Sequence, residues 1–295
     1  MLTPGAPVRP EILRAMVTAM THRGPDGESA WVSDDVALGM RRLAIVDIEG
    51  GTQPLRNERA TVHAVFNGEI YNHEAIRKEL ARHGHRFNSR TDGEVIPHLY
   101  EMYGPEFPRH LDGIFAIALW DAETRTLVLA RDHFGVKPLY YFRSGNEIRF
   151  ASEIKALLED PAVPRKLDPF ALDEHLTYRF TPAPRTLLAG VEKVEPGVSI
   201  VQRDGAFNKL RYWKSGQDER RDLSMEEAAD TLRTRLRASV HRQMMSDRPI
   251  GLMLSGGVDS AAVLALMSER SSRVKTFTIG FEGGGDADET PLAFR

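Results

Sequence analysis

Two pairs of short apolar runs constrain the fold of this chain more than any other feature. Residues 114–120 and 127–130 form the first pair, joined by Asp-Ala-Glu-Thr-Arg, and residues 139–142 and 148–151 form the second, joined by Ser-Gly-Asn-Glu. Apolar runs of this length separated by turn residues are typical of β-hairpins. Because helical patterns flank them, we predict antiparallel sheet covered by helices, an α+β architecture.

Further helices and strands are expected before these hairpins. Residues 10–20 place five apolar side chains on one helical stripe. These are Ile12, Leu13, Met16, Val17 and Met20. Helices are also predicted from Asn72 to near Gly84 and from Asp92 to near Gly104, each starting with a residue able to cap it. The remaining apolar stretches predict strands at residues 30–33, 36–40, 43–46 and 61–66.

The C-terminal part has a different pattern. Ser224 begins a long predicted helix whose capping box is closed by Glu227. Its expected buried stripe consists of Met225, Ala229, Leu232, Leu236, Val240 and Met244. A strand–loop–helix–strand pattern follows over residues 250–279, as in a parallel α/β unit. One such unit cannot cover both faces of a parallel sheet, so we expect exposed apolar side chains here.

We expect the domain boundary between about residues 205 and 223, since boundaries fall in polar linkers. The proline-rich stretch 161–196 predicts an extended connector around one short helix, and the polar stretch 214–222 predicts a linker. The expected organisation is a first domain with its connector over 1–205, a linker over 206–223 and a second domain over 224–295.

Composition and charge exclude several classes of function. Lys plus Arg is 39 and Asp plus Glu is 42, so the formal net charge is −3 and indicates neither nucleic acid nor an anionic membrane surface. No apolar run approaches the roughly 18 residues of a membrane span, and the first residues lack a signal-peptide pattern. We therefore predict small-molecule partners and a cytoplasmic location. The absence of cysteine excludes disulfides, thiolate metal ligands and a cysteine nucleophile.

The loop at residues 255–260 has the features of a phosphate-binding site. Its sequence, Ser-Gly-Gly-Val-Asp-Ser, lies between an apolar strand and a predicted helix. Glycines let the backbone approach a ligand, and the free N–H groups at a helix N-terminus attract an anion. Asp259 could hold Mg²⁺ or order the loop, and a tight glycine turn into a capped helix is the alternative. The loop lacks the lysine of Walker-type nucleotide sites.

Polar residues near the predicted strands of the first half have two interpretations each. Asn67 and Gly68 end an apolar strand, where they form either a turn or an oxyanion hole. Arg42 lies beside another strand, where it either binds a carboxylate or lies at the edge of the sheet without a ligand. Asp92 either caps a helix or holds an ammonium group.

These residues occur together with His-Arg-Gly-Pro-Asp-Gly at 22–27 and Arg-Asp-His-Phe-Gly-Val-Lys-Pro at 131–138. The set resembles the class II glutamine amidotransferase domain, an N-terminal-nucleophile hydrolase of four αββα layers with antiparallel sheets. The loop at 255–260 resembles the pyrophosphate loop of ATP pyrophosphatases. The combination resembles glutamine-hydrolysing asparagine synthetase, which implies that the second domain is the beginning of an α/β parallel-sheet ATP-pyrophosphatase domain.

The resemblance implies an ATP-dependent ligase of asparagine biosynthesis. Ammonia released from glutamine would attack aspartate adenylated by Mg-ATP, giving asparagine, AMP and pyrophosphate. Arg42 would bind the glutamine carboxylate, Glu69 and Asp92 its amino group, and Asn67 and Gly68 the oxyanion. The backbone of three further residues would line that pocket: Leu43, Ile45 and Val46.

The resemblance likewise implies a nucleotide site and its ligands. The residues that would bind ATP are Leu254, Ser255, Gly256, Gly257, Asp259, Ser260 and Ile279. The implied cofactors are ATP and Mg²⁺, the implied partners are glutamine, aspartate and ATP, and a homodimer is compatible with the family.

The sequence departs from the family pattern at its start. In the resembled family the nucleophile is a cysteine directly after the initiator Met, at the head of the first strand. This sequence begins Met-Leu-Thr-Pro and has no cysteine. We therefore expect a glutaminase-defective chain that lacks the first strand and represents an incomplete part of a longer enzyme. Two alternatives stay open: a related amidotransferase with another carboxylate acceptor, or a non-catalytic glutamine- or nucleotide-binding remnant.

Overall fold

The computed structural model describes residues 1–216, 222–280 and 289–293. The chain divides into two compact units, Met1–Gln217 and Asp218–Arg295, and each is described by itself. Among the described residues, no helix combines the length and the apolar character that crossing a membrane requires.

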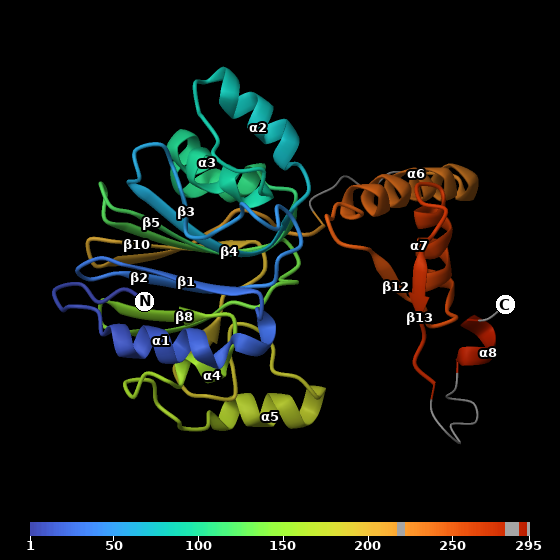
Figure 1. Ribbon diagram of the computed structural model, residues 1–295. Coiled ribbons are helices and arrows are strands. Elements are labelled where there is room, and N and C mark those ends of the chain that lie inside the picture. The colour runs from blue at the N-terminus through green and yellow to red at the C-terminus, as the bar shows by residue number, and fades with distance from the viewer. Residues whose placement is uncertain (217–221, 281–288, 294–295) are drawn as a thin grey trace. The chain divides into compact units, whose positions relative to one another are not determined.

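Two sheet layers between two helical layers form the first unit (Figure 1). The larger sheet has six antiparallel strands in the order β11-β10-β6-β5-β4-β3. These strands are β3 (Leu55–Arg56), β4 (Val62–Ile70), β5 (Gly113–Asp121), β6 (Thr126–Arg131), β10 (Val198–Arg203) and β11 (Ala206–Arg211).

The second sheet layer consists of two smaller antiparallel sheets, β1-β2 and β8-β7-β9. Their strands are β1 (Gly27–Val32), β2 (Ala37–Arg42), β7 (Tyr140–Ser144), β8 (Glu147–Ala151) and β9 (Val191–Lys193). Leu2 lies between them, because its backbone pairs with Val36 on one side and with Ile148 on the other.

Helices cover the outer faces of both layers. Figure 1 shows α2 and α3 over the larger sheet and α1 with α4 over the second layer. The α-helices of this unit are α1 (Pro10–Ala19), α2 (His73–Arg82), α3 (Val95–Tyr103), α4 (Ile154–Leu157) and α5 (Pro169–Tyr178). Short 3₁₀ helices are η1 (Thr21–Arg23), η2 (Asp92–Glu94) and η3 (Gly104–His110).

Three hydrophobic cores separate the four layers, and β5 contributes to two of them. Phe115 packs in the core beneath α2 and α3, whereas Trp120 packs between the two sheet layers. Met16 belongs to the third core, under α1 and α4. Successive side chains of a strand point to opposite faces, so a strand buried on both faces is apolar throughout. This burial explains the continuous apolar run that predicted β5.

Most predicted elements of the first unit are confirmed. The two hairpins are β5-β6 and β7-β8, both antiparallel, and the first helix buries Ile12, Leu13, Met16 and Val17. Asn72 precedes α2 as expected, but it does not cap the helix, because its side-chain oxygen accepts the Asp112 N–H and its amide donates to the His110 carbonyl. Asp92 likewise makes no cap, and its role is described below.

The strand predicted at 43–46 is wrong, because these residues form a loop. Two interactions turn the chain there: the Ala44 N–H donates to the Asp26 carboxylate at 2.9 Å, and Asp47 has a φ of 50°. Residues 206–211, expected in the linker, form β11, so the linker starts later than expected; residues 217–221 lie outside the described residues.

The second unit contains a small parallel sheet. Strands β12 (Gly251–Met253) and β13 (Lys275–Phe277) pair in parallel, with α7 (Val258–Ser268) between them in sequence. Helix α6 (Met225–Gln243) begins with the predicted capping box, and α8 (Thr290–Ala293) follows β13.

The predicted buried stripe of α6 is wrong. None of the residues of this helix is buried, and the side chains of Met225 and Leu232 are 86% and 65% exposed. A two-stranded parallel sheet offers too little apolar surface to cover the helix. The expectation of exposed apolar side chains is accordingly confirmed, with Met253, Phe277 and Ile279 also exposed.

Candidate functional site

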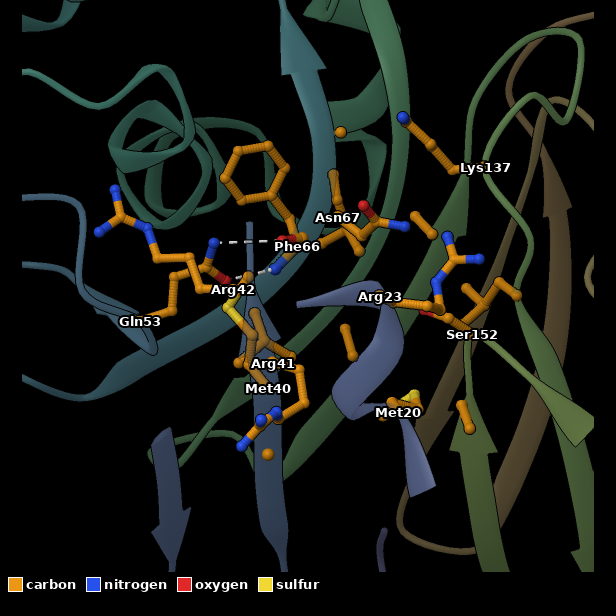
Figure 2. Close-up of a pocket in the computed structure, with 18 of the residues that line it drawn as sticks. Met20, Arg23, Met40, Arg41, Arg42, Gln53, Phe66, Asn67, Lys137 and Ser152 are labelled. Carbon is orange, nitrogen blue, oxygen red and sulfur yellow. Dashed lines mark hydrogen bonds between the residues drawn. The ribbon is translucent and has the colours of Figure 1, made fainter. Parts of the chain in front are cut away.

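A cavity of about 280 Å³ brings the predicted glutamine-site residues of the first unit together (Figure 2). It is lined by β2, β4, β5 and the residues after β8, with α1 along one side. All the predicted glutamine-site residues line it: Arg42, Leu43, Ile45, Val46, Asn67, Gly68, Glu69 and Asp92. They come from β2, the loop after it, the end of β4 and η2, so tertiary packing alone makes them neighbours.

The end of β4 places Asn67, Gly68 and Glu69 along one wall. Gly68 pairs with Phe115 of β5, and a Cβ at this position would lie 2.0 Å from the Ile114 carbonyl oxygen. No larger residue fits without moving the strands apart. The backbones of β4 and β5 therefore approach closely at Gly68, beside Asn67, and both residues line the cavity.

Two carboxylates lie at one end of this wall. Burial raises the pKa of Glu69, an effect that Lys137 opposes and Asp92 reinforces. Burial also raises the pKa of Asp92, although its Oδ2 accepts the Ile70 N–H at 2.7 Å, which acts the other way. Desolvated carboxylates close together gain from a cationic ligand, because a positive charge lowers the cost of keeping both ionised.

Arg42 holds the loop that follows it. Its guanidinium donates to the carbonyl oxygens of Val46, Asp47 and Ile48 at 3.2, 2.6 and 3.1 Å. A guanidinium has five N–H donors, so these three hydrogen bonds do not use all of them. Arg42 therefore shapes the loop that contributes Leu43 and Val46 to the cavity, in addition to lining the cavity itself.

Two lining residues were not assigned a role by the sequence. The Gln53 amide donates to the Phe66 carbonyl at 3.1 Å and accepts the Phe66 N–H at 2.7 Å, as the dashed lines in Figure 2 show. It thereby fixes β4 directly before Asn67. Lys137 reaches the cavity from the Arg-Asp-His-Phe-Gly-Val-Lys-Pro motif, which is the signal that could have identified it.

The buried amino end of Met1 also lines the cavity. Its α-amine donates to the Ala37 carbonyl at 2.6 Å, and burial together with the charge of Arg149 lowers its pKa to about 4.

The predicted phosphate loop lies at the carboxyl end of β12 and leads into α7. The hydroxyls of Ser255 and Ser260 are 3.2 Å apart, and the Gly257 N–H donates to Ser255 at 3.4 Å. Gly256 has a φ of 74°, and a Cβ there would lie 2.7 Å from the Cβ of Leu292. The loop conformation thus requires glycine, and hydroxyls and backbone N–H groups gather at a helix N-terminus, where an anion is favoured.

The remaining predicted nucleotide residues surround this loop. Leu254 is buried directly before it, and its carbonyl accepts the Thr278 hydroxyl at 2.8 Å. Ile279, next to Thr278, is 64% exposed, and Asp259 is exposed in the first turn of α7. The parallel pairing of β12 with β13 therefore brings residues 254 and 279 to the same edge of the sheet.

Comparison with known families gives two matches. Residues 3–213 match the glutamine amidotransferase domain model, and residues 231–295 match the asparagine synthase model.

In fold, the chain is similar to a glutamine phosphoribosylpyrophosphate amidotransferase from B. subtilis complexed with ADP and GMP. That likeness has a TM-score of 0.52 at 18% identity and covers 93% of this chain and 64% of the other. It shows the N-terminal-nucleophile hydrolase fold.

Curated relatives are similar over nearly the whole chain. Glutamine-hydrolysing asparagine synthetases 1 and 3 of Bacillus subtilis (strain 168) are 39% and 35% identical, over 93% and 90% of this chain. The amidase chry2 of Gibberella zeae is 34% identical over 97% of it. The chain spans 43%, 45% and 45% of the lengths of these three relatives.

Proposed function

Because this chain belongs to the glutamine amidotransferase domain family, we propose that the cavity of its first unit is a glutamine-binding site. One observation carries the proposal: residues from four separate elements, each predicted to contact glutamine, line a single cavity. Glutamine has an ammonium, a carboxylate and an amide, and the cavity offers carboxylates, a guanidinium and an Asn-Gly pair, which complement those three groups.

In the proposed complex, the glutamine ammonium lies between Glu69 and Asp92, the two carboxylates whose pKa burial raises. The remaining N–H donors of Arg42 bind the glutamine α-carboxylate. Asn67 and the Gly68 N–H bind the side-chain amide oxygen, on which negative charge develops when a nucleophile attacks. Gln53 acts as a positioning residue, because it holds β4 in register at Phe66.

We further propose that the longer enzyme represented by this chain is an asparagine-forming ligase. ATP would adenylate the side-chain carboxylate of aspartate and release pyrophosphate, and ammonia from glutamine would then attack the adenylate to give asparagine and AMP. The resemblance of both units to the asparagine synthetases of B. subtilis supports this reaction. The similarity to a relative with a different name, amidase chry2, leaves room for a second candidate, an amidotransferase that uses another carboxylate acceptor. Either reaction is proposed to take place in the cytoplasm.

The nucleotide proposal rests on the loop of the second unit. Serine hydroxyls, a backbone that requires glycine and the start of α7 fit a phosphate group. Ser255, Gly256, Gly257 and Ser260 would hold the pyrophosphate of ATP, and Asp259 is the residue available for Mg²⁺. Leu254 and Ile279 would contact the adenosine.

Hydrolysis of glutamine needs a nucleophile. In the resembled family this nucleophile is a cysteine, and these 295 residues contain none. We therefore propose that this chain binds glutamine without releasing glutamate. Titration of the chain with L-glutamine by isothermal calorimetry should give one site, whereas D-glutamine, which misplaces the ammonium, should not bind. Absence of L-glutamine binding contradicts the proposed site, and steady glutamate release contradicts the proposed defect.

The acceptor is tested separately from glutamine binding. Exchange of labelled pyrophosphate into ATP requires a competent adenylation site and depends on the carboxylate that is activated. Exchange that depends on aspartate in the longer enzyme supports the asparagine-forming reaction. Exchange supported only by a different carboxylic acid favours the second candidate.

A further inference from the structure

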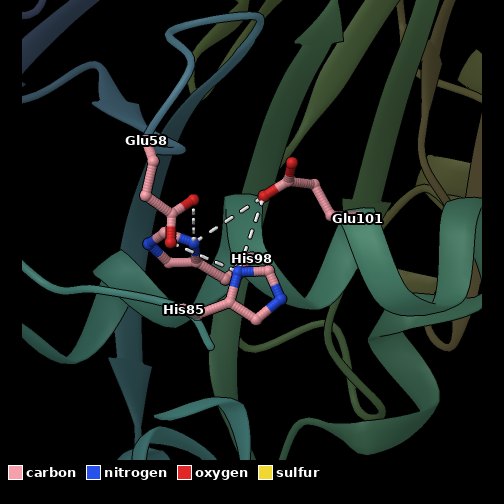
Figure 3. Close-up of side chains that lie close together, drawn as sticks. All are labelled: Glu58, His85, His98 and Glu101. Atoms are coloured by element: carbon pink, nitrogen blue, oxygen red, sulfur yellow. Dashed lines mark ion pairs between the residues drawn. The ribbon is translucent and has the colours of Figure 1, made fainter. Parts of the chain in front are cut away.

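Four potential metal ligands converge on the side of the first unit covered by α2 and α3 (Figure 3). Glu58 lies between β3 and β4, His85 follows α2, and His98 and Glu101 lie one turn apart on α3. One ligand atom from each residue lies within 4.8 Å of every other. None of these residues lines the glutamine cavity.

The separations between these atoms are those of a metal site. His98 Nδ1 lies 3.3 Å from Glu58 Oε2 and 3.8 Å from Glu101 Oε2, and His85 Nδ1 lies 3.4 and 3.7 Å from carboxylate oxygens of the same two residues. Tetrahedral zinc with bonds of about 2.0–2.1 Å separates its ligand atoms by about 3.3–3.4 Å. The ligand atoms, which lie within 4.8 Å of one another, would therefore move closer together around a bound ion.

Hydrogen bonding within the cluster does not account for it. The side chain of His98 is 1% exposed, and its Nδ1 forms ion pairs with Glu58 and Glu101, but within the described residues neither ring nitrogen meets the geometry of a hydrogen bond. Glu101 Oε2 is likewise buried without one. Buried polar atoms without partners cost about 1–3 kcal/mol each, so proteins seldom retain them unless something binds them.

One oxygen of each carboxylate accepts hydrogen bonds from neighbouring groups, and in Glu58 this is the oxygen that also lies 3.4 Å from His85 Nδ1. Glu101 Oε1 accepts the Asn57 amide at 3.0 Å and Arg59 at 3.3 Å, which leaves Oε2 directed toward the histidines. Glu58 Oε1 accepts the Arg86 N–H at 2.7 Å. Hydrogen bonds of this kind orient the carboxylates that bind the ion in metal sites.

We propose that Glu58, His85, His98 and Glu101 form a four-coordinate site for a divalent transition-metal cation, with zinc the ion that its two imidazoles and two carboxylates suit best. Zinc accepts nitrogen and oxygen ligands in tetrahedral geometry, whereas magnesium and calcium favour oxygen ligands alone. Bound there, the ion would tie α3 to the loops after β3 and α2. The next residues before α3 form η2, which carries Asp92.

The test uses the untagged 295-residue chain after removal of metal with EDTA. Titration with ZnCl₂ by isothermal calorimetry should give one ion per chain and raise Tm, since a ligand that binds only the folded state stabilises it. Loss of a residue that only hydrogen-bonds to a metal ligand typically weakens metal binding by roughly 10- to 100-fold. His85→Gln and Glu101→Gln remove ligands themselves, so each should weaken zinc binding by more than this.

The matched controls are His83→Gln and Glu74→Gln, two exposed positions on or beside α2 that lie outside the cluster. Both should bind zinc as the parent chain does. Failure of the parent chain to bind stoichiometric zinc overturns the proposal, as does binding that His85→Gln and Glu101→Gln leave unchanged.

A spectroscopic measurement on the parent chain keeps the proposal testable even if a variant does not fold. X-ray absorption at the zinc edge should show four nitrogen or oxygen neighbours, two of which give the multiple scattering of imidazole. A six-coordinate ion, or fewer than two imidazoles, contradicts the proposed site. A proton shared among the four side chains is the competing explanation, and it predicts no zinc uptake.

Discussion

At the residue scale, burial of the pair Glu69 and Asp92 has an energetic cost, and in the proposed glutamine site the same pair selects for an ammonium group. Their charges are desolvated in the absence of ligand, which raises the pKa of each carboxyl. A group that binds protons more readily in the folded state than in the unfolded state loses stabilising free energy as the pH rises through its raised pKa. The pair therefore lowers the free energy of unfolding at neutral pH, and a bound ammonium offsets that cost.

Asp92→Asn tests the ammonium contact. The substitution retains the size of the side chain but removes its charge, and a charge-assisted hydrogen bond contributes about 1.5–3 kcal/mol. We expect L-glutamine to bind about 10- to 100-fold more weakly, as measured by calorimetry. Asp34→Asn, at an exposed position outside the cavity, is the matched control. An unchanged dissociation constant for Asp92→Asn contradicts the assigned role.

The pH dependence of glutamine binding follows from the same pair. Because both pKa values are raised above their ordinary 4.5 and 3.8, protonation of the carboxyls begins at a higher pH than in exposed side chains. Glutamine affinity should decline on acidification while the pH is still above 4.5. Calorimetric titrations at a series of pH values measure this decline, and an affinity that stays constant down to 4.5 argues against the pair.

At the element scale, a buried ion pair joins β8 to the segment after α4. Arg149 donates to Asp160 at 2.7 Å, and Arg9, next to α1, lies 3.2 Å from the same carboxylate. Both Arg149 and Asp160 are almost fully buried, with side chains 5% and 1% exposed. Removal of Asp160 leaves the buried Arg149 with Glu147, whose side chain is 39% exposed, as its remaining carboxylate partner. A buried charge with fewer partners is destabilising.

Asp160→Ala should therefore lower the free energy of unfolding, and the roughly 3–5 kcal/mol of a fully unpaired buried charge is the upper limit because Arg149 keeps Glu147 as a partner. Chemical denaturation measures this loss, with the exposed Asp34→Ala as control. Although burial alone raises the pKa of Asp160, Arg149 lowers it below its ordinary 3.8. The stabilisation is then present above pH 3.8 and lost as the pH falls through the folded-state pKa, so the difference between parent and variant should shrink in acid.

The start of α5 permits a second matched comparison. Asp168 accepts the N–H groups of Phe170 and Ala171 at 2.9 and 3.2 Å, whereas Asp173 is exposed within the same helix. Loss of an N-terminal cap costs about 1 kcal/mol. Asp168→Ala should lower the free energy of unfolding by about that amount and Asp173→Ala by less, and equal losses contradict the capping role.

At the scale of the whole molecule, the two units differ in the size of their cores. The first has three cores between its layers, whereas the buried apolar side chains among the described residues of the second are Leu254, Leu266 and Met267. Apolar burial is the main favourable contribution to folding, at about 25 cal/mol per Å². The second unit should therefore unfold under milder conditions than the first.

The three tryptophans make this difference measurable. Trp31, Trp120 and Trp213 all belong to the first unit. In a urea titration, part of the helical far-ultraviolet signal should disappear before tryptophan fluorescence changes, because α6 and α7 lie in the second unit. Coincident transitions by both probes would indicate a single cooperative unit.

The sequence alone determined the features that depend on local pattern. The β5-β6 hairpin, the stripe of α1 and the capping box of Ser224 each follow from residues close together in the chain. The motifs also identified the residues that line the cavity. Periodicity and turn chemistry determine such elements because the interactions that select them act over a few residues.

Tertiary structure decided what depends on distant partners. Contacts with Asp26 and Arg42 made residues 43–46 a loop, and the small parallel sheet left α6 exposed. The role of Gln53 in holding Phe66, and the clustering of four side chains at α3, depend on strands and helices that bring distant residues together. The physical reason is that the chemistry of a side chain limits which surfaces it can pack against and which groups it can bind. Which surface or group it actually contacts depends on the positions of distant parts of the chain.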